Sequence, residues 1–290
     1  MQSVLSQLVQ QLALERLDRD LFRGQSQDLG WGAIFGGQVL GQSLSAATQT
    51  VAEERPVHSL HAYFLRAGDV RRPIVYQVDR IRDGHSFATR RVLAVQDGSA
   101  IFSLAASFQG EEPGFDHADA MPTVVGPDGL LSERELGLQL ADLVPEKLRP
   151  MATALRPIEL RPVQPRNPLR PKAVPPERYV WMRAIDELPH DLALHRYLLA
   201  YASDFSLLGA SLDPHGVSWL TRGMQVASLD HAMWFHRPFR LDQWLLYDIQ
   251  SPSASGSRGL VRGRFFNQQG QLVASVMQEG LIRQHAEPKA

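Results

Sequence analysis

An aspartate inside an apolar segment is the first candidate for chemistry. Residues 195–212 read HRYLLAYASDFSLLGASL, where nearly every residue is apolar or small, yet Asp204 stands in the middle. Burying a carboxylate costs free energy unless other groups pair with it. One interpretation is an N-cap that accepts backbone amides from the turn that follows. The other is a carboxylate base, and a base needs polar partners around it.

Two polar residues on later strands are candidate partners. Ser228 opens the predicted strand 227–238, and Gln278 lies in the last predicted strand, on one face with Val276. The internal repeat described below places both strands in the sheet that packs on the helix of Asp204. Spacing alone does not select these three residues, because an isolated serine or glutamine is more often structural than catalytic.

A glycine-rich helix start is the next candidate. In FGGQVLGQSLSA, Gly36 and Gly37 begin a predicted helix, and Gly37, Gly41 and Ser45 recur at helical spacing. Free amides at such a helix start can bind a substrate carbonyl or an oxyanion. A stripe of small residues also permits close packing of the helix on a sheet. The two interpretations are compatible, and we expect Gly36 and Gly37 to contribute to substrate binding.

Several other mechanisms are excluded by the residues present. The chain has no cysteine, no G-x-S-x-G nucleophile elbow and no phosphate-binding glycine loop. His58 and His61 are three residues apart on a predicted strand and therefore point to opposite faces, as do His231 and His236. We predict no metal site and no cofactor.

The composition of the chain limits which classes of partner are expected. The 290 residues include 30 Lys plus Arg and 31 Asp plus Glu, a balance that gives no bulk attraction to nucleic acid or to an anionic membrane. No apolar run approaches the roughly 18 residues of a membrane span. The first 22 residues are typical of an amphipathic helix rather than a signal peptide. We expect a cytoplasmic protein with no nucleic-acid partner and no membrane insertion.

Two regions of the chain repeat the same order of elements. A helix over 35–50 precedes strands at 58–66, 73–84, 86–98 and 99–110, and a helix over 195–212 precedes strands at 227–238, 243–255, 258–270 and 271–283. A helix wrapped by a curved antiparallel sheet is the hotdog unit. The pattern predicts an α+β double hotdog whose two sheets join into one continuous sheet and so hide open edges. Two unrelated α+β domains are the alternative.

We divide the chain into an N-terminal hotdog (1–112), a proline-rich connector (113–176) and a C-terminal hotdog (177–290). Twelve of the 19 prolines lie between positions 111 and 176, which predicts a long irregular connector outside the sheet, with one helix at 132–144.

The repeat also predicts a functional asymmetry between the halves. A constant offset aligns His58 with Ser228 and Phe108 with Gln278, and the first helix has no acid. The N-terminal half therefore lacks a complete water site. His58 is either a substrate-binding residue or a partner in a structural hydrogen bond.

Motifs along almost the whole chain resemble the type II acyl-CoA thioesterases. They include LFRGQS, FGGQVLGQ, VHSLHAYFLRAGD, YASDF, DHAMWFHRPF and ASVMQEG. The resemblance implies hydrolysis of fatty acyl-CoA by a water held between Asp204, Ser228 and Gln278. Bacterial relatives often have threonine where Ser228 stands, a mild departure because the hydroxyl is kept. The resemblance also implies a homo-oligomer, most simply a tetramer.

The implied chemistry agrees with the residues. A thiol with a pKa near ~8.5 leaves as thiolate without a strong acid, so one oriented water, one carboxylate and oxyanion donors suffice. One alternative is a hotdog enoyl-CoA hydratase, which pairs its Asp with a His a few residues later in the helix. After Asp204 the next histidine is His215, beyond the helix. The other is a non-catalytic acyl-CoA binding protein, which would release no thiol.

Overall fold

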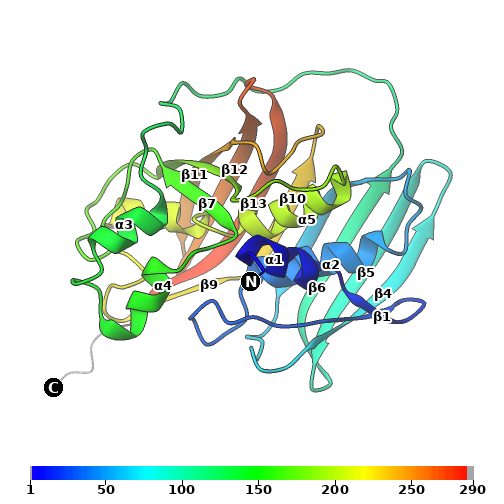
Figure 1. The fold of residues 1–290 in the computed structure, drawn as a ribbon, viewed down its shortest axis with the longest axis horizontal. Helices are drawn as coiled ribbons and strands as arrows, with labels where there is room; N and C mark the ends of the chain where they lie inside the picture. Colours follow the sequence, from blue (N-terminus) through cyan, green and yellow to red (C-terminus); the bar gives the residue numbers. More distant parts are fainter. Residues whose placement is uncertain (1, 286–290) are drawn as a thin grey trace.

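One large antiparallel sheet organises the protein. The structure is a computed structural model that describes residues 2–285, and its sheet has 13 strands (Figure 1). Twelve strands follow the order β1-β2-β4-β5-β6-β3-β10-β13-β12-β11-β8-β7, and β9 pairs with β13. Their bounds are β1 Glu15–Asp18, β2 Leu21–Gly24, β3 Val57–Phe64, β4 Ile74–Asp83, β5 Phe87–Gln96, β6 Ser99–Gln109, β7 Ile158–Pro162, β8 Glu177–Ala184, β9 Met224–Ser228, β10 Asp230–Phe235, β11 Leu245–Ser255, β12 Arg258–Asn267 and β13 Leu272–Gln284.

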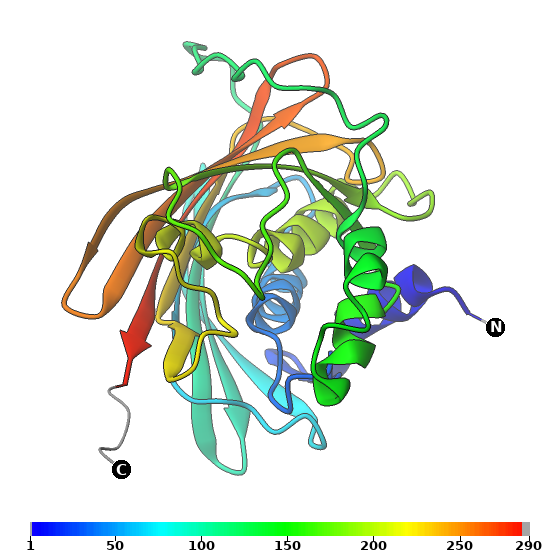
Figure 2. The same ribbon diagram turned by 90° about the vertical axis from the view of Figure 1, so that its left-hand side faces the viewer.

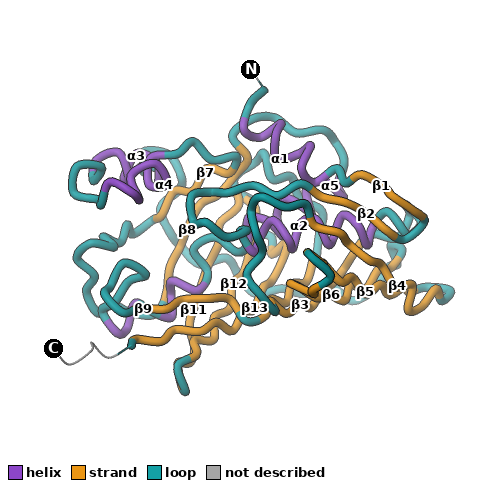
Figure 3. The backbone as a smooth tube through the Cα atoms, turned by 90° about the horizontal axis from the view of Figure 1, so that it is seen from below, coloured by secondary structure: helices purple, strands orange, loops and turns teal. Residues whose placement is uncertain are grey.

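The helices lie on one side of this sheet. The sheet curves around the long helices α2 and α5, which pack against each other (Figures 2 and 3). The helical bounds are α1 Val4–Leu12, α2 Gly36–Thr48, α3 Glu133–Gln139, α4 Arg149–Thr153 and α5 Leu192–Ser203, with 3-10 turns at η1 Glu146–Leu148, η2 Leu208–Ser211 and η3 Asp213–His215. Within residues 2–285, none of the helices is long and apolar enough to cross a membrane.

The two halves of the sheet join at a single pair of strands. β3 pairs antiparallel with β10, from Tyr63 opposite Asp230 to Ser59 opposite Trp234. Leu60 and Met233 are fully buried beneath this seam, because alternate residues of both strands point toward the helices. The predicted α+β double hotdog with one continuous sheet is confirmed.

The small-residue stripe packs helix on helix, whereas we expected helix on sheet. A Cβ added at Gly37 would lie 2.2 Å from the carbonyl oxygen of Tyr201, and one at Gly41 would lie 3.0 Å from that of Tyr197. Both acceptors belong to α5, so α2 and α5 approach each other backbone to backbone. Ser45 continues the stripe and donates a hydrogen bond of 2.7 Å to the carbonyl of Leu12 at the end of α1.

Two predicted helices differ from the observed ones. The helix predicted over 195–212 begins earlier, at Leu192, because Asp191 accepts amides of the first turn as its N-cap. It also ends earlier, at Ser203, and the chain continues in 3-10 turns. The predicted N-terminal helix covers only Val4–Leu12, and the hairpin β1–β2 follows it.

The connector is more regular than its prolines suggested. Apolar residues between 121 and 130 pack on the outer face of the sheet against Trp181 and Leu246, as expected for an outside crossing. The remainder departs from the prediction, because β7 joins the sheet as an edge strand beside β8 and α3 and α4 lie toward its helical side (Figure 2). The predicted helix at 132–144 is present as the shorter α3, which a capping box between Ser132 and Glu135 begins.

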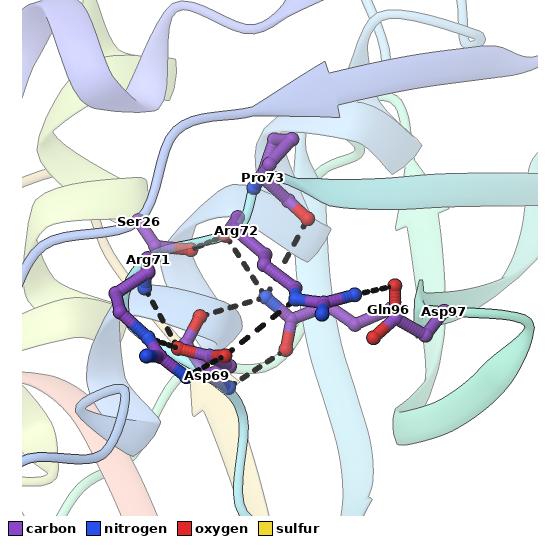
Figure 4. Close-up of polar contacts among 7 residues, drawn as sticks. All are labelled: Ser26, Asp69, Arg71, Arg72, Pro73, Gln96 and Asp97. Atoms are coloured by element: carbon purple, nitrogen blue, oxygen red, sulfur yellow. Dashed lines mark hydrogen bonds and ion pairs between the residues drawn. The ribbon is translucent and has the colours of Figure 1, made fainter.

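A buried amide fixes the turn between β3 and β4. The Nε2 of Gln96 donates to the carbonyls of Asp69 and Arg72, while its Oε1 accepts the backbone amide of Asp69 (Figure 4). Ser26 donates to the same carbonyl of Arg72 at 2.6 Å. These bonds hold the turn that follows Phe64, the last residue of β3.

Candidate active site

Asp204 lies where the ends of two helices meet. It is the C-cap of α5, and its carboxylate faces the backbone amide of Gly37 in the first turn of α2. The sequence left open an N-cap role for the following turn, but the amide comes from the other helix. A helix N-terminus attracts negative charge, and the first residue of α2 has no side-chain cap of its own. Asp204, at the end of α5, therefore caps the N-terminus of α2.

Gly36 permits this close approach. A Cβ added to Gly36 would lie 2.7 Å from the Oδ2 of Asp204 and 2.7 Å from the Cε1 of Phe64. Any larger residue would have to displace the carboxylate or the ring. The predicted glycine pair is thus placed directly against Asp204, with Gly36 leaving space for its carboxylate and Gly37 presenting an amide to it.

A break in one strand brings Ser228 beside Gln278. The predicted strand 227–238 is divided at Leu229 into β9 and β10, and both pieces pair with β13. Ser228 is the last residue of β9, opposite Gly280, and the break turns its hydroxyl toward Gln278. The Nε2 of Gln278 donates to the Oγ of Ser228 at 2.6 Å. Both side chains face the carboxylate of Asp204, so the structure brings the predicted trio together.

Burial raises the pKa of the Asp204 carboxylate. Desolvation raises its pKa from 3.8 to about 6, although the Gly37 amide, Gln278 and Ser228 each pull it back down. Aromatic rings lie nearby: Phe64 and the carboxylate of Asp204 both border Gly36, and Phe205, the next residue in the chain, stacks on Phe35 with ring centroids 4.4 Å apart. A carboxylate with a pKa near neutrality is a stronger base than an ordinary one and still largely ionised at pH 7.

A histidine that the sequence analysis considered only as a metal ligand joins this site. His231 is buried on β10, and its Nδ1 lies 2.8 Å from the Oε1 of Gln278. Its Nε2 lies 2.9 Å from the Oγ of Ser203. Burial lowers the pKa of His231 to about 4, so the ring is neutral. The available signal was period-two alternation, which puts His231 on the inward face of β10 with Met233.

His58 lies apart from the trio. Its Nε2 is 2.8 Å from the Oγ of Ser107 on β6, and its ring meets Phe87 edge-on. It stands six residues before Phe64 on β3, which corresponds to ~20 Å along an extended strand. The N-terminal half has different residues at the positions that correspond to Asp204 and Gln278. Gln49 is the C-cap of α2, as Asp204 is of α5, and the fully buried Phe108 aligns with Gln278.

The described residues contain no cluster of three or more His, Cys, Asp or Glu that could hold a metal ion. What they do contain is a carboxylate of raised pKa with a hydroxyl and an amide that face it. On a double hotdog these groups are of the kind that can orient a water molecule and accept its proton, which is the chemistry of a hydrolase.

Comparison with known proteins gives the family. Residues 149–281 match the acyl-CoA thioesterase family, and residues 26–109 match the acyl-CoA thioesterase N-terminal domain. The chain is 44% identical over 283 residues to acyl-CoA thioesterase 2 of Haemophilus influenzae, covering 98% of this chain and 99% of that protein. It is also 44% identical over 280 residues to human acyl-coenzyme A thioesterase 8, covering 94% and 87% respectively. The chain belongs to the acyl-CoA thioesterase family.

Solved structures agree with this placement. An acyl-CoA thioesterase II from Mycobacterium marinum has a TM-score of 0.77 and 43% identity, over 97% of this chain and all of that one. A hotdog protein from Alicyclobacillus acidocaldarius has a TM-score of 0.76 over 97% of this chain, but at 18% identity it supports the fold alone.

Proposed function

We propose that the protein hydrolyses fatty acyl-CoA to free fatty acid and coenzyme A, using a water oriented by Asp204, Ser228 and Gln278. The observation that carries the proposal is the 2.6 Å hydrogen bond from Gln278 to Ser228 beside a carboxylate whose pKa burial raises to about 6. Membership of the acyl-CoA thioesterase family supports the choice of substrate.

The reaction balances with these groups alone. Asp204 accepts a proton from the water as the water oxygen forms a bond to the thioester carbonyl carbon. The tetrahedral intermediate then collapses, the carbon–sulfur bond breaks, and the thiolate leaves with the bonding electron pair. Because a thiol with a pKa of ~8.5 leaves readily, the proton on Asp204 need not be transferred before that step. The proton passes afterwards to the thiolate or to solvent, which restores the carboxylate of Asp204 for the next turnover. Ser228 and Gln278 orient the water without carrying charge.

A thiol-release assay tests this function. Short-, medium- and long-chain saturated acyl-CoAs are supplied, and free coenzyme A is measured with a thiol reagent. We expect steady turnover by the wild type and its loss in Asp204→Asn. Stoichiometric binding without thiol release would identify a carrier instead. Loss of enoyl absorbance from an enoyl-CoA without thiol release would identify a hydratase.

The remaining substrate contacts are also proposals. Because the amide of Gly37 faces Asp204, Gly37 would act on the substrate through that carboxylate, and the neighbouring amide of Gly36 at the start of α2 would bind the thioester carbonyl or the oxyanion that forms from it. His58 would contact substrate only at a point well removed from the reacting carbon, because it lies toward the far end of β3 from Phe64. Substitution of His58 should therefore change KM more than kcat.

The outer face of the sheet supports the proposed homotetramer. Near the seam, Tyr63 and Met277 are 63% and 39% exposed on the face away from the helices. Covering such apolar side chains favours association. Light scattering at micromolar concentration should give four times the 32.4 kDa chain mass, and a monomer mass would contradict the proposal. The same proposal includes a cytoplasmic location and a role in fatty acid metabolism. It also keeps the division of the chain into an N-terminal hotdog (1–112), a connector (113–176) and a C-terminal hotdog (177–290).

A further inference from the structure

A chain of buried hydrogen bonds extends from the trio back into the protein. It runs from Ser228 to Gln278, then to His231, and ends at Ser203 in the last turn of α5. Gln278, His231 and Ser203 are each at most 1% exposed. The proposed reaction needs only the first two members of this chain, so His231 and Ser203 require another explanation.

Donor and acceptor roles along the chain are mutually dependent. The side chain of Gln278 has a donor end and an acceptor end, and the carboxylate of Asp204 needs the donor end. With Nε2 toward Ser228 and Asp204, the Oε1 of Gln278 can only accept, so the Nδ1 of His231 must carry the proton. Because the ring is neutral, its Nε2 is then bare and accepts the hydroxyl proton of Ser203.

The reverse arrangement is also self-consistent within the chain. Ser203 lies 2.9 Å from the carbonyl of Ala200 as well as from the Nε2 of His231, and its single proton can reach only one of them. If Ser203 donated to Ala200, the Nε2 of His231 would carry the proton and its bare Nδ1 would require the amide nitrogen of Gln278. The Oε1 of Gln278 would then face the carboxylate of Asp204, and two acceptors would oppose each other.

We propose that His231 is a positioning residue that, as its Nδ1–H tautomer, holds the amide of Gln278 with its donor end toward Ser228 and Asp204. It touches neither water nor substrate and acts through Gln278. The inference rests on the proposed function, since a fixed orientation of Gln278 has a catalytic consequence only if Gln278 orients the water.

Two substitutions of similar size and polarity separate positioning from mere packing. The amide of His231→Asn can place a donor where Nδ1 stands, toward Gln278. The longer His231→Gln places its amide where Nε2 stands, toward Ser203. We expect the Asn variant to retain kcat within about threefold, and the Gln variant to lose at least about tenfold, the cost of one misplaced hydrogen bond. Similar losses in both variants, or full activity in both, would overturn the inference.

The acid limb of the pH–rate profile supplies a second readout. Without a fixed donor from Gln278, the carboxylate of Asp204 is less stabilised, so in His231→Gln the limb should move to higher pH. The other titratable groups around Asp204 are Tyr247, which stays neutral in the buried sheet, and Glu133 and Arg156, which contact Ser206 and Phe205. His236→Gln is the control, because His236 follows the opposite end of β10 and forms an exposed hydrogen bond with Ser275 there. Its limb should not move.

The tautomer can be measured even if the variants do not fold. Nitrogen-15 NMR of histidine-labelled wild type should show His231 with a protonated Nδ1 and a bare Nε2, and a protonated Nε2 would overturn the inference. Asp204→Asn, assayed in parallel, separates the two hypotheses. Unchanged turnover in that variant would remove the catalytic trio. An inactive Asp204→Asn together with equal activity of the two position-231 variants would remove only the role of His231.

Discussion

The Nε2 of Gln278 lies 2.6 Å from the Oγ of Ser228, although 50 positions separate the two residues in the chain. The contact exists because the strand carrying Ser228 breaks at Leu229 and both pieces remain paired with β13. A continuous strand would carry Ser228 past this position. The break therefore converts two neutral side chains on one sheet into a pair that faces Asp204.

Substitutions within the trio should not have additive effects. We expect Asp204→Asn to lose about 10²–10⁴-fold in kcat with little change in KM, the usual cost of removing a positioned base. Ser228→Thr should keep most activity because the hydroxyl survives, while Ser228→Ala and Gln278→Ala should each lose much of it. A double variant should be little worse than the poorer single variant, since all three residues orient one water. Full turnover in a folded Asp204→Asn protein would end the assignment.

The architecture could be predicted from the sequence because a helix followed by four strands occurs twice in the chain. In both copies the strands either alternate apolar and polar residues or are apolar throughout, as strands of a half-buried or buried sheet do. The sequence was sufficient for the trio only through the family motifs, because nothing in the spacing of Ser228 or Gln278 separates them from structural residues. The break at Leu229 and the early end of α5 at Ser203 depend on tertiary packing. His231 was considered only as a metal ligand, because alternation along the strand places the side chain on the inward face but does not say which partners it meets there.

Activity should fall on the acid side as Asp204 becomes protonated. A base works as its carboxylate, and burial raises the pKa of Asp204 to about 6. The rate should therefore decline as the pH drops through about 6, well above the range of an ordinary aspartate. Profiles of kcat/KM against pH with a short-chain acyl-CoA would measure this limb in the free enzyme. A limb near pH 4 would show that Asp204 is solvated or is not the base.

The same pKa shift should appear in stability. The folded pKa of Asp204, about 6, lies above its unfolded value of 3.8, so folding favours the protonated form. The stabilisation from that form is fully present below the unfolded pKa and is lost as the pH rises through the folded pKa. The melting temperature of Asp204→Asn minus that of the wild type should therefore increase from about pH 4 to about pH 7. His231 is common to both proteins, so its opposite dependence cancels in the difference. A flat difference would contradict the shift.

The adjacent glycines of α2 should respond differently to alanine. At Gly37 the new Cβ would lie 2.2 Å from the backbone oxygen of Tyr201, so α2 and α5 must separate, and we expect Gly37→Ala to cost ~1–3 kcal/mol of stability. At Gly36 the obstacles are the carboxylate of Asp204 and the ring of Phe64, both side-chain ends that can move. Gly36→Ala should therefore melt closer to the wild type but lose kcat, because Asp204 is displaced from Gln278.

The matched control for both variants is Gly110→Ala. The nearest atom to its added Cβ is the carbonyl oxygen of Glu54 at 3.7 Å, an ordinary contact. Thermal melts and thiol-release rates measured on the three variants would separate the effect of each substitution on stability from its effect on turnover. If Gly36→Ala lost stability as much as Gly37→Ala while keeping its turnover per folded molecule, the close approach at Gly36 would serve helix packing rather than the placement of Asp204.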